Sequence, residues 1–251
     1  MKTLLIDGDI LAFQAAAATE VPTKWDDDLW TLHAYESEGQ AHIKQALTKI
    51  KKATGCTKMR MFLTGKQNFR VDILPTYKGN RKDTRKPMTL GPLKQWLIDE
   101  YAGELKEPYE ADDLIGIAAT QDPNTIIVSE DKDFLCIPCN LYNPRHPDRG
   151  VITVNESSAD RYFYSQVLTG DTADNYKGCP SAGPVKTEKI LDAAEFDYWP
   201  AVVEAFVKQG LTEDDALVQA RCARILRYED TDLKGDMILW NPPASNQLLQ
   251  V

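Results

Sequence analysis

Two short apolar segments of this chain each end in a pair of acidic residues. Residues 3–6 are followed by Asp7-Gly8-Asp9, and residues 125–129 are followed by Asp131 and Asp133. Both segments have the length and composition of buried strands, and helical patterns lie between them. Strands that alternate with helices predict an α/β domain with a mostly parallel sheet.

The other predicted elements extend this organisation to about residue 155. We expect helices over roughly 26–54, over 90–101 and over 111–120, and a further strand over 59–63. The pattern after Glu156 is almost entirely helical, with one late strand candidate at 237–240. The chain is therefore expected to form an α/β domain over residues 1–155 and a helical domain over residues 156–251.

Composition excludes several classes of protein. The 251 residues are 43% hydrophobic and 27% charged, which is typical of globular proteins. No apolar run approaches the length of a membrane span, and Asp7 interrupts the start where a signal peptide would be apolar. Among the five cysteines, Cys136 and Cys139 form a C-x-x-C without a second pair. We therefore expect a reduced, intracellular protein rather than a membrane, secreted, disulfide-rich or zinc-ribbon protein.

Charge is distributed unevenly along the chain. The net charge is −9, but residues 58–86 contain nine basic and two acidic residues, a local charge of +7. A basic segment in an otherwise acidic protein suggests that an anionic partner is bound locally.

Acidic residues recur after predicted strands and in the first turns of predicted helices. They fall into four groups: Asp7 and Asp9; Glu110, Asp112 and Asp113; Asp131 and Asp133; Asp171 and Asp174. The carboxyl ends of parallel strands share one edge of a sheet, where ligands bind. We therefore expect these groups to converge.

Two roles compete for each acidic group. Any one group taken alone is more simply explained as a helix N-cap or as a favourable charge near a helix N-terminus. Six to eight convergent carboxylates, however, repel one another unless cations neutralise them. Oxygen ligands without a His and Cys constellation favour Mg²⁺ or Mn²⁺, and two such ions suit phosphodiester hydrolysis. The convergence therefore predicts a two-metal site for phosphoryl chemistry.

The order of the motifs resembles that of the flap endonuclease (5′-nuclease) family, and most closely that of small phage-encoded 5′→3′ exonucleases. The residues that carry the resemblance are Asp7-Gly8-Asp9, Phe69-Arg70, Tyr77-Lys78-Gly79-Asn80-Arg81, Glu110-Ala111-Asp112-Asp113, Ser129-Glu130-Asp131-Lys132-Asp133, Gly170-Asp171-Thr172-Ala173-Asp174-Asn175 and the segment 178–187. Each motif alone is weak, but the first six of these in this order are specific.

The resemblance implies a fold and a metal site. It implies a PIN-like core with a helical arch at residues 75–88, followed by a helix-hairpin-helix region of the three-helix kind. The residues of the segment 75–87, which is polar, basic and bracketed by prolines, are themselves compatible with either a loop or a mobile helical segment. It also implies two Mg²⁺ or Mn²⁺ ions, and a K⁺ ion at the turn of residues 178–187. The metal ligands implied by position are Asp7, Glu110, Asp112, Asp113, Asp131, Asp133, Asp171 and Asp174, with Asp131 and Asp133 also counted as catalytic.

The resemblance also implies the residues that hold nucleic acid. Lys78 and Arg81 would be catalytic basic residues of the arch, and Arg70 would contact phosphate. The full set of predicted nucleic-acid contacts is Arg70, Tyr77, Lys78, Arg81, Lys82, Arg85, Lys86, Lys186 and Thr187. The Tyr77 ring either stacks on a base or anchors its loop.

Some residues remain unassigned or receive a structural interpretation. Residues 162–164, Tyr-Phe-Tyr, are interpreted as core of a helix. The three histidines show no metal-ligand spacing. Arg221, Arg224 and Arg227 either contact phosphate or pair with the acidic residues upstream of them.

One position departs from the family pattern. The family normally has an aspartate just after the strand that precedes the arch, whereas this chain has Gly65 there. Asp72, seven residues further on, is the nearby acid that would have to take its place. The departure raises a question about the position or affinity of one metal ion.

The expected activity is metal-dependent 5′→3′ hydrolysis of duplex DNA with 5′ ends or flaps, and of RNA primers in RNA–DNA hybrids. Such an enzyme would act as a monomer in phage DNA replication or host DNA degradation, in the cytoplasm of a bacterial host. One alternative is a PIN-type ribonuclease, which would not need the arch motif or the turn of residues 178–187. The other is a DNA-junction binding protein with impaired catalysis, which only Gly65 favours.

Overall fold

The computed structural model describes residues 2–243 and divides them into two compact units. The first contains the chain up to Phe69, Arg81–Ala159 and Ile225–Tyr228, and the second contains Arg70–Asn80, Asp160–Arg224 and the chain from Glu229. The units thus differ from the two expected contiguous domains, because residues 70–80 belong to the second unit and residues 225–228 belong to the first. Met1 and residues 244–251, which were assigned to those domains, lie outside the described residues.

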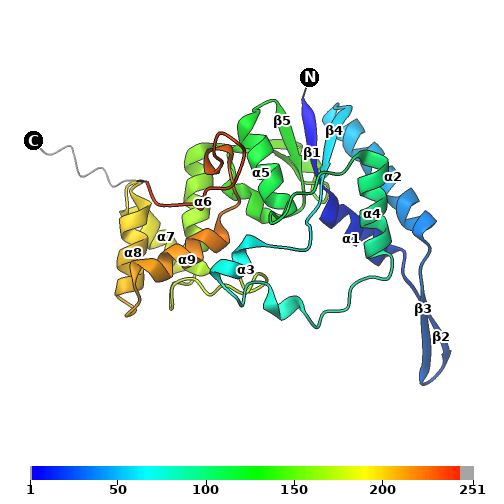
Figure 1. Ribbon diagram of the computed structural model, residues 1–251, viewed down its shortest axis with the longest axis horizontal. Coiled ribbons are helices and arrows are strands. Elements are labelled where there is room, and N and C mark those ends of the chain that lie inside the picture. The colour runs from blue at the N-terminus through cyan, green and yellow to red at the C-terminus, as the bar shows by residue number, and fades with distance from the viewer. Residues whose placement is uncertain (1, 244–251) are drawn as a thin grey trace, which may run out of the picture. The chain divides into compact units, whose positions relative to one another are not determined.

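The first unit is built on a five-stranded sheet in the order β4-β1-β5-β6-β7 (Figure 1). Its strands are β1 (Thr3–Asp7), β4 (Lys58–Phe62), β5 (Thr125–Val128), β6 (Cys139–Tyr142) and β7 (Val151–Val154). The pairs β1–β4, β1–β5 and β5–β6 are parallel, and only β6–β7 is antiparallel. The predicted α/β fold with a mostly parallel sheet is confirmed.

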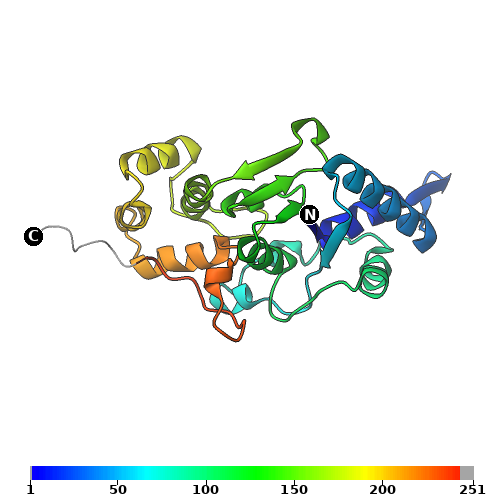
Figure 2. The same cartoon turned by 90° about the horizontal axis from the view of Figure 1, so that it is seen from above.

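Helices cover both faces of this sheet because its central strands are apolar on both sides. Leu4 and Ile6 of β1 belong to a core that also contains apolar residues of three helices, α1 (Gly8–Ala18), α2 (Glu36–Thr54) and α4 (Leu90–Tyr101). Leu5 alternates to the opposite face, and α5 (Ala111–Gln121) packs against β1, β4 and β5. Figure 2 shows α1 and α2 side by side. The sheet is thus buried as parallel sheets are.

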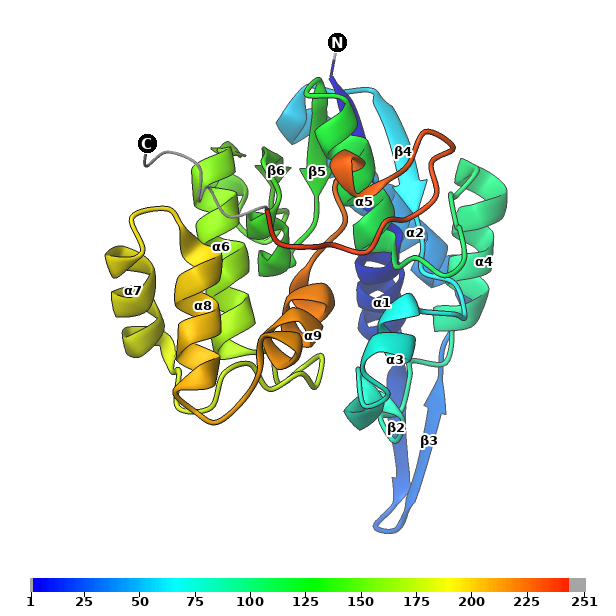
Figure 3. The ribbon, with the colours of Figure 1, turned by 60° about the vertical axis from the view of Figure 1, so that its left-hand side comes forward.

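The predicted helix over residues 26–54 is wrong in its first part. Residues 21–33 form an antiparallel hairpin of β2 (Val21–Asp26) and β3 (Leu29–His33), and α2 begins only at Glu36. Aromatic residues favour strands, and aspartates favour turns, so the Asp26-Asp27-Asp28 run closes a hairpin instead of opening a helix. Figure 3 shows this hairpin extending away from α1. Trp25 and Trp30 are 68% and 58% exposed.

The second unit is mainly helical. Its helices are α3 (Phe69–Ile73), which starts at the boundary, most of α6 (Glu156–Thr169), α7 (Pro184–Ala193), α8 (Tyr198–Val207) and α9 (Glu213–Ala223). Phe163 and Tyr164 of α6 pack against Trp240, and Tyr164 also contacts Tyr198. Phe163 and Tyr164 belong to the core as predicted, whereas Tyr162, the third residue of that prediction, is only half-buried. The late strand expected at 237–240 is absent from the described residues, where Met237 makes a single bridge to Thr231.

The basic segment contains no α-helix between α3 and α4. It has one 3-10 turn, Gly79–Arg81, followed by turns and irregular chain up to Thr89. Of the two forms open for this segment, the structure thus has the loop and not the helical form that an arch at residues 75–88 would take. In the described part of the chain, no helix is both long and apolar enough to cross a membrane.

Candidate functional site at the carboxyl edge of the sheet

Asp7 lies at the end of β1, where three parallel strands reach the same edge. Its carboxylate caps α1, because Oδ1 accepts a hydrogen bond from Ile10 N at 3.1 Å. Its other oxygen accepts the hydroxyl of Ser129, which follows β5, at 2.9 Å. The parallel pairing of β1 with β5 thus brings Asp7 beside the Ser129–Asp133 motif.

The surroundings of Asp7 strongly raise the pKa of its carboxyl group. Burial, as the largest cause, and the charges of Asp9 and Asp131 together raise the pKa of Asp7 to about 7, while hydrogen bonds from Ile10 and Ser129 oppose the shift. Three carboxylates therefore interact at this edge of the sheet. A cation bound there would offset both the desolvation and the repulsion.

Asp131 and Asp133 follow β5 as predicted. Asp131 caps a 3-10 turn, Lys132–Cys136, by accepting Asp133 N at 2.8 Å. Its own N–H donates to the Ser129 hydroxyl at 3.1 Å. Ser129 therefore links the Asp7 carboxylate to the backbone of Asp131, while the Asp133 N–H orients the Asp131 carboxylate.

These oxygen donors fit a hard divalent cation, although the geometry is not that of a completed metal site. Buried and half-buried carboxylates without histidine or thiolate neighbours are the donors that Mg²⁺ and Mn²⁺ prefer. Within residues 2–243, however, no three His, Cys, Asp or Glu side chains are arranged to hold one ion together. The side chains would have to close around the ion.

The Glu110–Asp113 motif combines capping with the acidic edge. Glu110 and Asp113 form a reciprocal capping box at the start of α5. Asp113 is fully buried, and its oxygens accept Glu110 N and Leu226 N, each at 3.1 Å. Both oxygens are thus occupied by backbone donors, and we assign Asp113 a structural role instead of the metal ligation implied by resemblance. Asp112, between them, is half-buried.

Asp171 and Asp174 belong to the second unit, in the turn after α6. Asp171 Oδ1 accepts Ala173 N and Asp174 N, which closes the turn. Asp174 Oδ2 accepts the Tyr77 hydroxyl at 2.8 Å and lies 3.5 Å from Lys78 Nζ. Within this unit, a predicted metal ligand is therefore paired with a predicted catalytic lysine.

Arg70 and Tyr77 have structural roles that differ from the nucleic-acid contacts implied by resemblance. Arg70 is 2% exposed, and its guanidinium donates to the carbonyl oxygens of Cys222 and Arg224 at the end of α9. Tyr77 is 5% exposed, with its hydroxyl on Asp174. Burial keeps the Arg70 guanidinium from phosphate and the Tyr77 ring from bases. The anchoring interpretation of Tyr77 is the one that fits the structure.

The later part of the basic segment belongs to the first unit. Arg81, Lys82 and Lys86 are exposed. Arg85 is also exposed, but it makes a bidentate pair with Glu20, at 2.9 and 2.6 Å. The Arg85 hydrogen bonds and a backbone hydrogen bond from Met88 lower the pKa of Glu20 to about 2. Phosphate would therefore have to displace Glu20 from Arg85.

Residues 178–187 form a turn that leads into α7. Gly178 and Ser181 have positive φ angles of 65° and 63°, and Gly178 N donates to Gln219 Oε1. Lys186 is exposed. Thr187 is fully buried and its hydroxyl donates to Ala182 O at 3.1 Å. The Thr187 side chain therefore braces the turn and does not contact nucleic acid directly, because it has no exposed surface.

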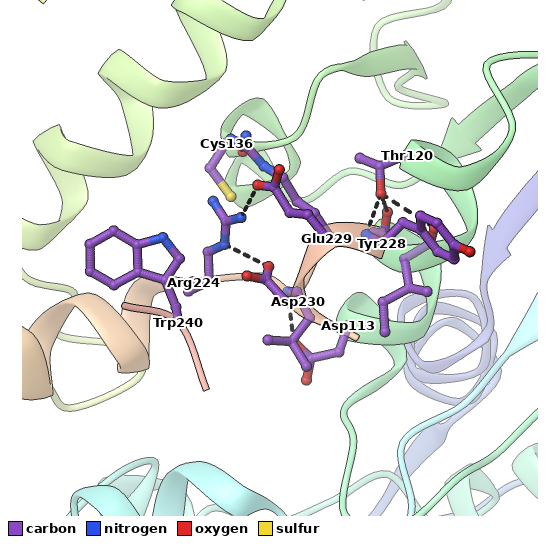
Figure 4. A network of polar contacts seen from close by, with 12 residues as sticks. Asp113, Thr120, Cys136, Arg224, Tyr228, Glu229, Asp230 and Trp240 are labelled. Carbon is purple, nitrogen blue, oxygen red and sulfur yellow. Dashed lines mark hydrogen bonds and ion pairs between the residues drawn. The ribbon is translucent and has the colours of Figure 1, made fainter. Parts of the chain in front are cut away.

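The C-terminal arginines stabilise the protein itself. Arg224 is buried and pairs with Asp230 at 2.9 Å and Glu229 at 2.7 Å within the second unit (Figure 4). In the first unit, Arg227 donates to Cys136 O, and Tyr228 N donates to the Thr120 hydroxyl. Arg221 donates to Trp240 O and Asn241. Arg224 therefore pairs with acidic residues, but these follow it in the chain, whereas the prediction named acids upstream.

Two residues at the acidic edge were not predicted from the sequence. Lys94 of α4 forms an ion pair with Asp9, in which the lysine Nζ lies 2.7 Å from Asp9 Oδ1. That oxygen is buried and accepts no hydrogen bond. Glu107 accepts Lys66 N and Gln67 N, and its carboxylate fills the space that a Cβ at Gly65 would enter. Neither residue lies in a recognisable motif, and only the tertiary structure brings them to the loop after β4.

Comparisons with known proteins agree with this architecture. A family model described as "5'-3' exonuclease, N-terminal resolvase-like domain" matches residues 2–156. An exodeoxyribonuclease of Enterobacteria phage T3 is 27% identical over 95% of this chain and 92% of its own length. An exonuclease of Escherichia phage T7 is 26% identical over 95% of this chain and 93% of its own length.

A solved structure shows the same fold. The T5 D15 protein co-crystallised with metal ions aligns with a TM-score of 0.66 over 90% of both chains, at 12% sequence identity. At that identity the likeness concerns the fold alone. The overall fold is thus shared with a protein of very different sequence.

Proposed function

The chain belongs to the 5′-3′ exonuclease family, and from that premise we propose that it hydrolyses phosphodiester bonds at 5′ ends and flaps of duplex DNA with the help of divalent metal ions. The observation that carries the proposal is the interaction of Asp7 with Asp9 and Asp131 at the carboxyl edge of the sheet. The phage exonucleases that resemble this chain over 95% of its length support the reaction class.

The proposed metal ligands in the first unit are Asp7, Glu110, Asp112, Asp131 and Asp133. Asp171 and Asp174 of the second unit remain proposed ligands. Two Mg²⁺ or Mn²⁺ ions would supply an activated water and neutralise charge on the leaving 3′-oxygen. Ser129 holds Asp7 and Asp131 in place through its hydroxyl. Asp9 and the backbone of α1 complete the support of this edge.

The proposed substrate contacts are basic and exposed or half-buried. Lys78 and Arg81 would offset charge on the scissile phosphate, while Lys82, Arg85 and Lys86 would hold the neighbouring backbone. Lys186 would contact the duplex from the turn of residues 178–187, where a K⁺ ion is also proposed. These contacts carry no sequence information, so cleavage would depend on the structure of the DNA end.

The wider role is proposed from the same reasoning. The enzyme would also remove RNA primers from RNA–DNA hybrids, and would act as a monomer in the cytoplasm of a bacterial host during phage DNA replication or host DNA degradation. The relatives from phages T3 and T7 support a phage setting.

The proposal is tested with 5′-labelled duplex, flap and hybrid substrates, each incubated with Mg²⁺ and with EDTA. We expect release of 5′ products from all three with Mg²⁺ and none with EDTA. Asp131→Asn provides the matched control, because it should bind the same DNA without cleaving it. Cleavage that persists in EDTA would reject the metal-dependent mechanism.

The same experiment separates the alternatives. A PIN-type ribonuclease would cleave only the RNA strand, and a DNA-junction binding protein would retain the flap substrate without turnover. Gly65 was the only feature in favour of lost catalysis. The carboxylate of Glu107 lies against that glycine, so an acidic group is present beside Gly65 although the residue itself is not an acid.

A further inference from the structure

Lys94 is placed between three segments that meet at the acidic edge. Its ammonium lies 2.7 Å from Asp9 Oδ1 and donates to Thr64 O at 3.0 Å. Asp9 Oδ2 in turn accepts Thr64 N at 3.0 Å. The lysine, the aspartate and the loop after β4 therefore form a closed polar triangle that joins α4, the start of α1 and β4.

The charge of this lysine acts on the acidic edge directly. Among the described residues, Lys94 is the only basic side chain paired with Asp7, Asp9 or Asp131. Asp9 and Lys94 side chains are each 28% exposed, so solvent screens the pair only in part. The three carboxylates with Lys94 carry a formal charge of −2, and without it they would carry −3.

We propose that Lys94 is the built-in counter-ion of the acidic edge: by pairing with Asp9 it withholds that carboxylate from divalent ions and leaves ion binding to Asp7 and Asp131. Lys94 is thus a positioning residue, because it acts through Asp9 and Thr64. The inference rests on the proposed metal-dependent function. It explains why Asp9 is beside the site with both oxygens already engaged.

The test measures Mg²⁺ binding without any nuclease reaction, by calorimetry and by the rise in melting temperature of metal-free protein titrated with MgCl₂. Lys94→Met removes the charge and keeps much of the side-chain length, whereas Lys94→Arg keeps the charge. Lys52→Met, at an exposed position in α2, controls for the loss of one positive charge from the whole protein.

We expect Lys94→Met to melt at a lower temperature without metal, because Asp9 is left unpaired beside two carboxylates. Its half-saturating Mg²⁺ concentration should fall at least about threefold, since the local negative charge increases and Asp9 becomes available. Lys94→Arg and Lys52→Met should stay within about twofold of wild type.

The double variant Asp9→Asn/Lys94→Met covers the case in which the single variant does not fold. It keeps the local charge of −2, so its half-saturating Mg²⁺ concentration should equal that of wild type. A strong loss of Mg²⁺ binding in the double variant would make Asp9 a ligand and overturn the inference. Unchanged or weaker binding in Lys94→Met, with a normal response in wild type, would also overturn it. A wild-type protein that does not respond to Mg²⁺ at all would reject the proposed function together with the inference.

Discussion

Asp113 and Asp7 are the same residue type in the same unit, both buried, yet their surroundings are opposite. Asp113 receives a backbone N–H on each oxygen, from Glu110 and from Leu226. Asp7 receives two hydrogen bonds as well, but it also faces the charges of Asp9 and Asp131. A buried carboxylate that accepts a backbone N–H on each oxygen stabilises the fold. A buried carboxylate that faces other carboxylates is repelled by them, and a bound cation would offset that repulsion.

The largest expected effect belongs to the edge carboxylates. Asp131→Asn should lower turnover by more than about tenfold, because it removes negative charge that would hold a cation. The melting temperature without metal should stay equal or rise, since repulsion of Asp7 is relieved. Nuclease assays in Mg²⁺ and melting in EDTA measure the two quantities. Full activity in Asp131→Asn would show that Asp131 is not needed for metal binding and in this respect does not differ from Asp113.

The converse change concerns Asp113. Asp113→Ala leaves two buried backbone N–H groups without acceptors, which should lower the free energy of unfolding by about 2–5 kcal/mol. Urea denaturation measures this loss, with Asp112→Ala as the neighbouring control at a half-buried position. Turnover per folded molecule should change much less than in Asp131→Asn. A stable but inactive Asp113→Ala protein would contradict the structural role.

A smaller effect is expected in the pH dependence of the metal-free protein. The pKa of Asp7 is raised to about 7 by burial, whereas in the unfolded chain it has its ordinary value. The folded state therefore binds one more proton between about pH 4 and pH 7. Its stability is full below about pH 4 and falls as pH rises through 7. Denaturation in EDTA at several pH values should show this slope, and Asp7→Asn should flatten it.

The smallest effect is expected at Gly65 and Glu107. Gly65→Asp would place a side chain where the Glu107 carboxylate lies, so the single variant should lose the Glu107 hydrogen bonds to the loop. The fair comparison is Gly65→Asp/Glu107→Gln against Glu107→Gln. If an acid in this loop assists metal binding, the double variant should need less Mg²⁺ for half-maximal activity than Glu107→Gln. Equal Mg²⁺ requirements would show that this loop does not face the metal.

Local structure was largely predictable because its causes are local. The apolar strands at residues 3–6 and 125–128 and the helix at 90–101 follow from periodicity and from the residues that end them. The hairpin of residues 21–33 was missed because Asp26-Asp27-Asp28 is compatible with either a helix start or a turn. Only pairing between the two strands decides between them.

The roles of basic and hydroxyl side chains were less predictable than the elements that carry them. Arg70 and Thr187 lie in recognisable motifs, but both are buried and bonded to carbonyl oxygens. A motif specifies that a residue occurs near a site, but packing decides whether its side chain points toward the site or into the protein.

By itself, the sequence determined the α/β class, the family and the set of acids that follow strands, because these depend on residues adjacent in the chain. The tertiary structure decided which acids meet each other and which meet backbone donors. Asp9 and Thr64 are 55 residues apart, and Asp113 and Leu226 are 113 apart. Such partners are brought together only when the sheet and its helices pack, and it is the packed neighbours that decide which groups each carboxylate contacts.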